Sequence, residues 1–159
     1  MANIIRMKIE GKNQGLISAG CGTFDSIGNK YQAAHTNEIL VYSAAHSITR
    51  EQSASHHPFT IVKPIDKSSP LLGVSISENE ELYVELGFYQ TDHSGGLEKY
   101  YSIQLRKAFL SCININYPHS LTHEDSQPEE IISLNYRDIV WTHHKAGTSG
   151  YSICSDRVY

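Results

Sequence analysis

The sequence predicts a mainly β protein, either a barrel or a sandwich, with one helix. Apolar and polar residues alternate with period two in several segments, which is typical of strands that bury one face. Only one segment spaces its apolar residues by three and four, as an amphipathic helix does. The length of 159 residues suggests a single domain that needs neither metal nor disulfide to fold.

Three strands are predicted in the first half of the chain. The first buries Ile5, Met7 and Ile9 and turns charged residues outward. The second covers Glu38 to Ile48 and has few charges, so both of its faces are expected to be covered. The third ends at Pro64, which cannot donate a ladder hydrogen bond. Its buried face is expected to hold Phe59, Ile61 and Ile65.

The second half contains a hairpin and a last long strand. The clearest strand alternates the apolar residues Leu82, Val84, Leu86 and Phe88. A turn follows over Gln90 to Gly96, where Gly95-Gly96 supplies positive φ angles. The return strand starts with Tyr101, Ile103 and Leu105, slips by one residue near Lys107-Ala108, and resumes on Phe109, Ile113 and Ile115. The slip predicts a bulge or bend of the kind found where a sheet curls into a barrel. The last strand runs from Ile132 through Leu134, Tyr136 and Ile139 to Trp141.

One helix is predicted to begin at Ser69-Pro70, which pairs a capping hydroxyl with a proline at the first helical position. Its apolar stripe consists of Leu71, Leu72, Val74 and Ile76, and Asn79 is a plausible end. Because so short a helix is marginal alone, it is expected to lie against a sheet or a neighbouring chain. Two polar loops remain, Gly20 to Asn37 and Pro118 to Glu130.

Charge and hydropathy exclude several classes of function. Lys and Arg number 13 against 17 Asp and Glu, and a net charge of −4 disfavours binding to nucleic acid or an anionic membrane. The N-terminus meets a charge after five residues, so it holds no apolar core of a signal peptide. The longest uncharged apolar run, Ile39 to Ala45, is too short to cross a bilayer. Any export is therefore expected to proceed without a cleaved leader.

The nine histidines give weak evidence for a metal site. His143 and His144 are adjacent in a strand, so they point to opposite faces. His56-His57 precedes Pro58 in a predicted loop. His119 and His123 have the i, i+4 spacing of a helical chelate, but they follow Pro118 in a segment better suited to a loop. Solvated or hydrogen-bonded histidines are the favoured interpretation.

No catalytic constellation is predicted. Gly147 to Gly150 lacks the spacing and context of a nucleophile elbow and is expected to be a flexible turn. Glu80-Glu81 and Glu129-Glu130 are expected to be solvated. The three cysteines are predicted to be free thiols, Cys112 inert in the core, Cys21 in a loop and Cys154 in a tail. The chain is therefore predicted to be no enzyme, with no metal and no cofactor.

Several motifs together resemble the haemolysin-coregulated protein (Hcp) family of bacterial type VI secretion. They are Met7 to Lys12, Gln14 to Cys21, Ile27 to Lys30, Lys63 to Leu72, Glu98 to Tyr101, Tyr136 to His144 and Ala146 to Tyr151. Two blocks are distinctive as a pair: Asp66, Lys67, Ser68, Ser69 and Pro70, and then Trp141, Thr142, His143 and His144. The resemblance implies that these residues form a structural motif.

The resemblance also implies a fold and a role. The expected fold is a small β-barrel built from two antiparallel sheets with one flanking α-helix, a single domain over residues 1–159. Residues 152–159 are expected to be a short tail without an effector domain. The expected role is that of a homohexameric ring that stacks into a tube. A contractile sheath and a spike protein expel this tube, and its lumen carries small effector proteins.

Such a subunit is expected in the bacterial cytoplasm before firing, and then outside the cell or in a target cell. Ring contacts are expected on Ile39 to Ala45 and Phe109 to Ile115, and ring stacking on the two polar loops. Two alternatives stay open: a phage tail-tube protein of the same architecture, and a metal-dependent β-barrel enzyme that uses His119 and His123.

Overall fold

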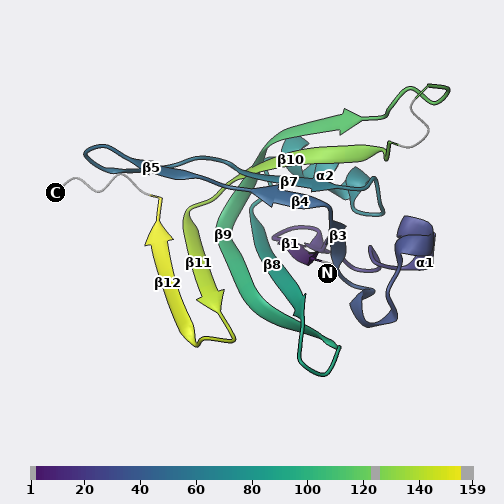
Figure 1. The fold of residues 1–159 in the computed structure, drawn as a ribbon. Coiled ribbons are helices and arrows are strands. Elements are labelled where there is room, and N and C mark those ends of the chain that lie inside the picture. The colour runs from purple at the N-terminus through teal and green to yellow at the C-terminus, as the bar shows by residue number, and fades with distance from the viewer. Residues whose placement is uncertain (1–2, 123–125, 155–159) are drawn as a thin grey trace.

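The computed structural model describes residues 3–122 and 126–154 (Figure 1). In chain order its elements are β1 (Ile4–Gly11), β2 (Gly15–Leu16), α1 (Phe24–Ile27), the 3₁₀ turns η1 (Gly28–Lys30) and η2 (Ala33–His35), β3 (Ile39–Val41), β4 (Ser43–Ala45), β5 (Ile48–Arg50), β6 (Ala54–His56), β7 (Phe59–Lys63), α2 (Ser69–Ser77), β8 (Leu82–Thr91), β9 (Leu97–Asn116), β10 (Glu129–Asn135), β11 (Asp138–His143) and β12 (Thr148–Ile153).

The strands form two antiparallel sheets that share β9. Sheet A contains β2, β3, β1, β8, the first part of β9, β11 and β12. Sheet B contains the second part of β9, followed by β10, β7 and β4. The hairpin of β5 and β6 stands apart as a two-stranded sheet and projects away from the body (Figure 1). The mainly β class with two sheets and a flanking helix is thus confirmed. The strand order is an open path from β2 to β4, so the closed barrel is not confirmed.

The predicted slip in the return strand is confirmed. The pairing of β8 with β9 shifts between Leu82↔Ala108 and Val84↔Leu105, and Lys107 has a φ of 48°. A bulge with one left-handed residue bends its strand strongly. This bend lets one 20-residue strand leave sheet A and enter sheet B. In the turn before β9, Gly95 alone takes a positive φ, of 87°.

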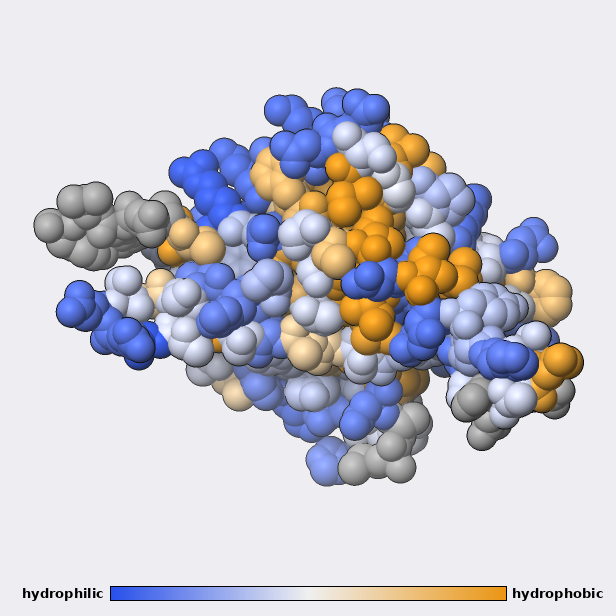
Figure 2. Space-filling model, turned by 90° about the horizontal axis from the view of Figure 1, so that it is seen from above, coloured by the Kyte–Doolittle hydropathy of each residue, from blue (hydrophilic) through white to orange (hydrophobic). Residues whose placement is uncertain are grey.

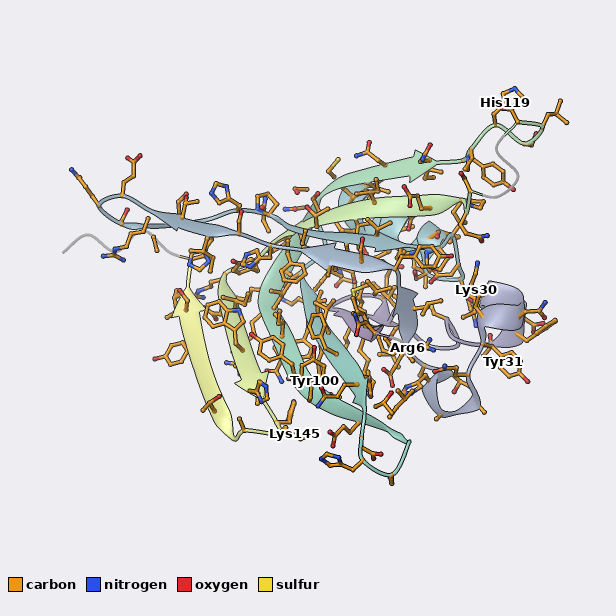
Figure 3. The ribbon with its side chains drawn as sticks, in the orientation of Figure 1. Arg6, Lys30, Tyr31, Tyr100, His119 and Lys145 are labelled. Atoms are coloured by element: carbon orange, nitrogen blue, oxygen red, sulfur yellow. The ribbon has the colours of Figure 1, made fainter. Side chains whose placement is uncertain are left out.

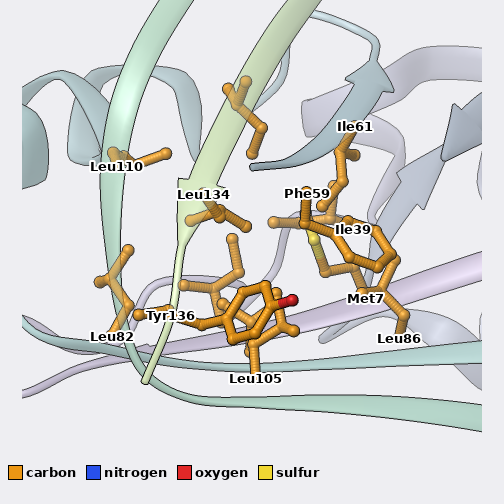
Figure 4. Close-up of a cluster of buried hydrophobic side chains, with 14 of the residues drawn as sticks. Met7, Ile39, Phe59, Ile61, Leu82, Leu86, Leu105, Leu110, Leu134 and Tyr136 are labelled. Carbon is orange, nitrogen blue, oxygen red and sulfur yellow. The ribbon is translucent and has the colours of Figure 1, made fainter. Parts of the chain in front are cut away.

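The core lies between the two sheets. Met7, Leu86 and Leu105 from sheet A meet Phe59, Ile61 and Leu134 from sheet B, and all are at most 2% exposed (Figure 4). The inward residues of β7 are Phe59, Ile61 and Lys63, whereas Ile65 is 40% exposed. The prediction for Ile65 is wrong because the strand ends before it.

The segment Glu38 to Ile48 is not one doubly covered strand. It breaks at Tyr42, whose backbone N–H donates to the Val62 carbonyl at 2.7 Å, so β3 belongs to sheet A and β4 to sheet B. Ile39 and Val41 are buried, but Ala45 and all of β5 are exposed. A local apolar composition does not show where a chain changes sheets.

The end of the chain also differs from the prediction. The expected last strand is two strands, β10 and β11, separated at Tyr136 and Arg137 and lying in different sheets. A flexible turn was expected over Gly147 to Gly150. Of these residues only Gly147, with a φ of 75°, lies in a turn, and the other three belong to β12. Likewise His56 is the last residue of β6, not a loop residue.

Helix α2 begins at Ser69, as predicted, but its N-cap residue lies one position before the predicted cap. Ser68 is the N-cap, Ser69 is helical, and Pro70 lies in the first turn. Leu72 is fully buried, but Val74 is 48% exposed, so only part of the apolar stripe faces the core. The first predicted loop contains a second, short helix, α1. None of the helices in residues 3–122 and 126–154 is long and apolar enough to cross a membrane.

Candidate assembly surfaces

A buried ionic cluster fixes the start of α2 to sheet B. The Lys63 Nζ lies 3.0 Å from Asp66 Oδ1 and 2.8 Å from Glu130 Oε1, and all three side chains are at most 1% exposed. Lys63 is the last residue of β7, and Glu130 lies opposite it on β10. Lys63 therefore connects the predicted motif residue Asp66, just before α2, to Glu130 on β10. Sequence reasoning missed Lys63 and took Glu130 for a solvated residue, although the alternation of β7 places Lys63 inward.

Two serines complete this cluster. The backbone N–H and the hydroxyl of Ser68 both donate to Asp66 Oδ1, the N–H at 2.9 Å. The Ser69 hydroxyl accepts the Asp66 backbone N–H at 3.1 Å and lies 3.3 Å from Glu130 Oε1. Hydrogen bonds of this kind compensate for the desolvation of buried charges. The motif thus holds the helix at a fixed place on the sheet.

The remaining residues of the first block lie at the surface. Lys67 and Pro70 are exposed, and the Lys67 backbone N–H donates to the Ser26 hydroxyl at 2.9 Å. An added Cβ on Gly20 would lie 2.9 Å from the Lys67 Nζ, and Gly20 has a φ of 70°. A glycine at position 20 therefore satisfies both the turn and the close approach of Lys67.

The second block belongs to sheet A and does not join the first. Trp141 is partly buried and packs against the core. His144 Nε2 lies 2.9 Å from the Ser102 hydroxyl, and His143 Nδ1 accepts the Ala146 backbone N–H at 3.0 Å. The two histidines therefore have separate partners. Their contacts hold β11 and its turn against β9.

Glu80 is buried, contrary to the expectation of solvation. Its Oε2 accepts the backbone N–H groups of Asn13 at 2.7 Å and Gln14 at 2.8 Å, and its Oε1 accepts the Ser75 hydroxyl at 3.1 Å. Burial alone raises the pKa of Glu80, but the hydrogen bonds from Gln14, Asn13 and Ser75 outweigh it and lower that pKa. A Cβ on Gly11 would overlap Glu80 Oε2, so any larger residue at position 11 would push the carboxylate away from these hydrogen bonds. The carboxylate ties the β1–β2 turn to α2.

The core cysteine is not the predicted one. Cys21 lies in a loop, as predicted, but it is fully buried, and burial raises the pKa of its thiol to about 12. Cys112, expected in the core, is only partly buried and faces away from it on β9. Cys154 is exposed. The core thiol is therefore Cys21.

The metal alternative finds no support within the described ranges. No three His, Cys, Asp or Glu side chains gather there as a set of metal ligands. His119 lies on an exposed loop, where its Nδ1 accepts the backbone N–H groups of Leu121 and Thr122, each at 3.3 Å (Figure 3). His123 lies outside the described residues.

Sheet B ends in two strand edges that pair with nothing else in the described chain. One edge is β4, and the other is the second part of β9, residues 109–116, which pairs with β10 on one side. The sequence singled out Ile39 to Ala45 and Phe109 to Ile115 for ring contacts, and the two edges contain Ser43 to Ala45 of the first stretch and all of the second. Ile39 and Val41 of the first stretch are instead buried in the core of the subunit itself. Ile115 at the β9 edge is 64% exposed, and Figure 2 shows apolar side chains gathered over β9, β10 and α2. Unpaired edges of this kind are sites for association with another chain.

The two polar loops are brought side by side. Lys30 Nζ of the first loop donates to Gln127 Oε1 of the second at 3.1 Å. Next to Lys30, the exposed rings of Phe24 and Tyr31 pack edge to face at 5.9 Å (Figure 3). The loops therefore form one surface at the end of the molecule opposite the β5–β6 hairpin (Figure 1).

The domain has two unpaired edges on sheet B, and its buried charges hold structural elements together. These are the features of a structural protein that associates with copies of itself. Comparison with known proteins makes this class specific. The family profile described as "Type VI secretion system effector, Hcp" matches residues 7–143. The chain therefore belongs to the Hcp family of type VI secretion, whose members are secreted structural tube proteins and not enzymes.

Individual relatives agree with this assignment. The "Major exported protein" of Pseudomonas aeruginosa is 36% identical and covers 94% of both chains. "Uncharacterized protein YhhZ" of Escherichia coli is 42% identical over 93% of this chain, which spans only 37% of that relative's length. The structure titled "Crystal structure of Hcp protein" superposes with a TM-score of 0.92 at 33% identity over 98% of this chain and 100% of its own. "Secreted protein Hcp3 from Pseudomonas aeruginosa" gives a TM-score of 0.88 at 36% identity, with 98% and 100% of the chains covered.

Proposed function

We propose that this chain is the subunit of a type VI secretion inner tube, and that it forms hexameric rings that stack. The observation that carries this proposal is the pair of free edges on sheet B. The edges belong to one four-stranded sheet and differ from each other, being β4 and residues 109–116 of β9. If β4 of one subunit meets β9 of the next, the contact is heterologous, and it closes into a ring when the angle between the edges fits.

Such a contact would decide which face lines the channel. In β7 and β10 the buried residues alternate with partly exposed ones. The buried face is covered by sheet A and α2, so the opposite face would surround the ring axis. That face carries small or uncharged residues, namely Ser43, Ala45, Thr60, Val62, Cys112, Asn114, Ile131 and Ser133, with Glu129 at its rim.

The size of this channel follows from strand spacing. Six copies of four strands, about 4.8 Å apart, give a circumference of roughly 115 Å and a backbone diameter of about 37 Å. After side chains are subtracted, a channel of this size admits a small folded protein. This supports the carriage of small effectors in the lumen.

The remaining partners follow from the resemblance and the surfaces. Ring stacking would use the joined polar loops around Lys30 and Gln127 at one end, because they are exposed and outside both sheets. The spike protein and the contractile sheath would be partners of the stacked tube. The subunit would remain in the bacterial cytoplasm until the machine exports it.

The edges are tested by introducing charge on each. Ala45 on β4 and Ser111 on β9 are both exposed, as is Ser149 on β12, the edge of sheet A. Ala45→Lys and Ser111→Lys are each expected to weaken the hexamer, and the double lysine variant should be weaker than either. Ala45→Lys combined with Ser111→Glu should recover assembly, because unlike charges then face each other. Ser149→Lys is the matched control and should assemble like wild type.

Assembly is measured by sedimentation velocity and by negative-stain microscopy at micromolar concentration. A hexamer with ring-shaped particles is expected for wild type. A stable monomer of 17.8 kDa would contradict the ring. If Ser149→Lys disrupts the ring while Ala45→Lys and Ser111→Lys do not, the ring exists but its contacts lie on sheet A.

A further inference from the structure

We propose that the β5–β6 hairpin is held to the body by a proton-sensitive chain of hydrogen bonds through Tyr136, so that mild acid releases the hairpin. The inference concerns the single chain and goes beyond the proposed ring. It rests on four side chains from four separate segments: His46 and His56 both contact the Tyr136 phenol, and Ser152 contacts His56.

Tyr136 lies between β10 and β11, and its hydroxyl contacts two histidines. His46 Nε2, between β4 and β5, lies 2.7 Å from the Tyr136 hydroxyl. His56 Nδ1, at the end of β6, lies 2.7 Å from the same hydroxyl. The other ring nitrogen of His56, Nε2, lies 3.0 Å from the Ser152 hydroxyl on β12. Both roots of the hairpin are thus attached to the two sheets through Tyr136.

The Tyr136 hydroxyl carries one proton, so while both histidines are neutral it donates to one of them and accepts from the other. The second ring nitrogen of His56 faces the Ser152 hydroxyl, which can donate or accept as that tautomer requires. A proton added to the accepting histidine would place N–H donors from both rings on the Tyr136 oxygen and would leave the Tyr136 hydroxyl proton without its acceptor. The donor and acceptor roles would then no longer match.

The surroundings of both rings disfavour their charged forms. Burial is the main cause that lowers the pKa of His46, and the nearby imidazoles of His56 and His57 lower it further. Burial also lowers the pKa of His56. Among the described residues, the Phe59 ring stacks on His46 at 4.9 Å and Cys154 lies near Tyr136. No carboxylate of the described residues is among the causes that shift the pKa of His46 or of His56.

The sign of the effect follows from linkage. The folded pKa values lie below the ordinary value of 6.5, so this stabilisation is fully present above pH 6.5 and is lost as pH falls through the folded values. Each histidine that becomes charged on opening can raise the opening equilibrium by up to about tenfold per pH unit. The hairpin buries little surface of its own, since all of β5 and Ala54 and Ser55 are exposed. Opening is therefore expected to stay local.

The test is amide hydrogen exchange of residues 46–57 at pH 7.5 and pH 5.0, corrected for the intrinsic rate at each pH. Wild type is expected to lose protection in this segment by at least tenfold at pH 5.0, whereas β8 keeps its protection. In Tyr136→Phe the segment should exchange fast at both values, so that its pH dependence disappears. His93→Gln is the control, because it removes an exposed histidine in the turn between β8 and β9, outside this cluster, and it should behave like wild type.

Ser152→Ala is a milder variant, because it removes only the hydroxyl at the end of the hydrogen-bond chain, next to His56. It should lower hairpin protection at pH 7.5 by a smaller factor than Tyr136→Phe does. Equal corrected protection of the wild-type hairpin at both pH values would overturn the proposal. So would an unchanged pH dependence in Tyr136→Phe or, if that variant does not fold, unchanged hairpin protection in Ser152→Ala. Loss of ring assembly in any variant is a separate measurement and does not enter this comparison.

Discussion

Replacing Lys63 by methionine should destabilise the fold far more than its small change in volume suggests. The substitution keeps a long apolar stem but leaves Asp66 and Glu130 buried without their cation, which lies 3.0 Å from one and 2.8 Å from the other. Removing one partner of a buried ion pair costs about 3–5 kcal/mol, because the remaining charge stays desolvated. For a domain of this size that corresponds to a fall in Tm of about 6–20 °C.

The assay is equilibrium urea unfolding followed by circular dichroism, at one protein concentration so that assembly contributes equally. Lys67→Met is the matched control, because Lys67 belongs to the same motif but is exposed, and it should change the free energy of unfolding by at most about 0.5 kcal/mol. Lys63→Met combined with Glu130→Met should be more stable than Lys63→Met alone, since one orphaned charge is removed. If Lys63→Met costs no more than Lys67→Met, the cluster does not organise the start of α2.

Three further outcomes are expected. Glu80→Gln should lower the free energy of unfolding by about 1–3 kcal/mol at pH 7. The difference from wild type should shrink below pH 4.5, because the lowered pKa of Glu80 gives a stabilisation that is present above the ordinary value and lost in acid. A difference that does not depend on pH would argue against the hydrogen bonds to the Glu80 carboxylate. Leu72→Asp should lower stability by several kcal/mol, whereas Val74→Asp, on the exposed side of the same helix, should change it little; similar melting curves for the two would refute the assigned burial. Thiol titration in denaturant without reductant should find three free groups per chain, and a count of one would show a disulfide.

The alternation of apolar and polar residues predicted most of the fold, because it depends only on residues that are neighbours in the sequence. The strands β1 and β8 follow it directly, and the bulge at Lys107 is visible as a break in its phase. Where the alternation is weak, prediction failed. β12 consists largely of Ser, Thr, Gly and Tyr, and its strand conformation comes from pairing with β11. A polar sequence of that kind resembles a turn until its partner strand is known.

The buried charges show a different limit. Glu80 and Glu130 each stand beside another acidic residue, Glu80 just before β8 and Glu130 at the start of β10, where solvation is the usual outcome. Their burial depends on Gln14 and Lys63, which lie far away in the chain. Composition cannot reveal such a pairing. The start of α2 at Ser69-Pro70 could be predicted, because a proline in the first turn of a helix is a local signal. Asp66 was singled out only by the family resemblance.

The proposed ring and the buried cluster would be connected through the geometry of sheet B. A heterologous ring closes only if the two contact surfaces keep a fixed angle. Here the two edges belong to one sheet, so that angle is set by the twist between β4 and β9 across β7 and β10. Lys63 and Glu130 pair across the two middle strands, and Asp66 binds the same lysine from the start of α2. The cluster thus holds β7 and β10 together, and these are the two strands that lie between the edges β4 and β9. β9 in turn connects sheet B covalently to sheet A. A sheet held in this way would keep the same angle between the two contact surfaces in every copy, which a closed ring of identical subunits requires.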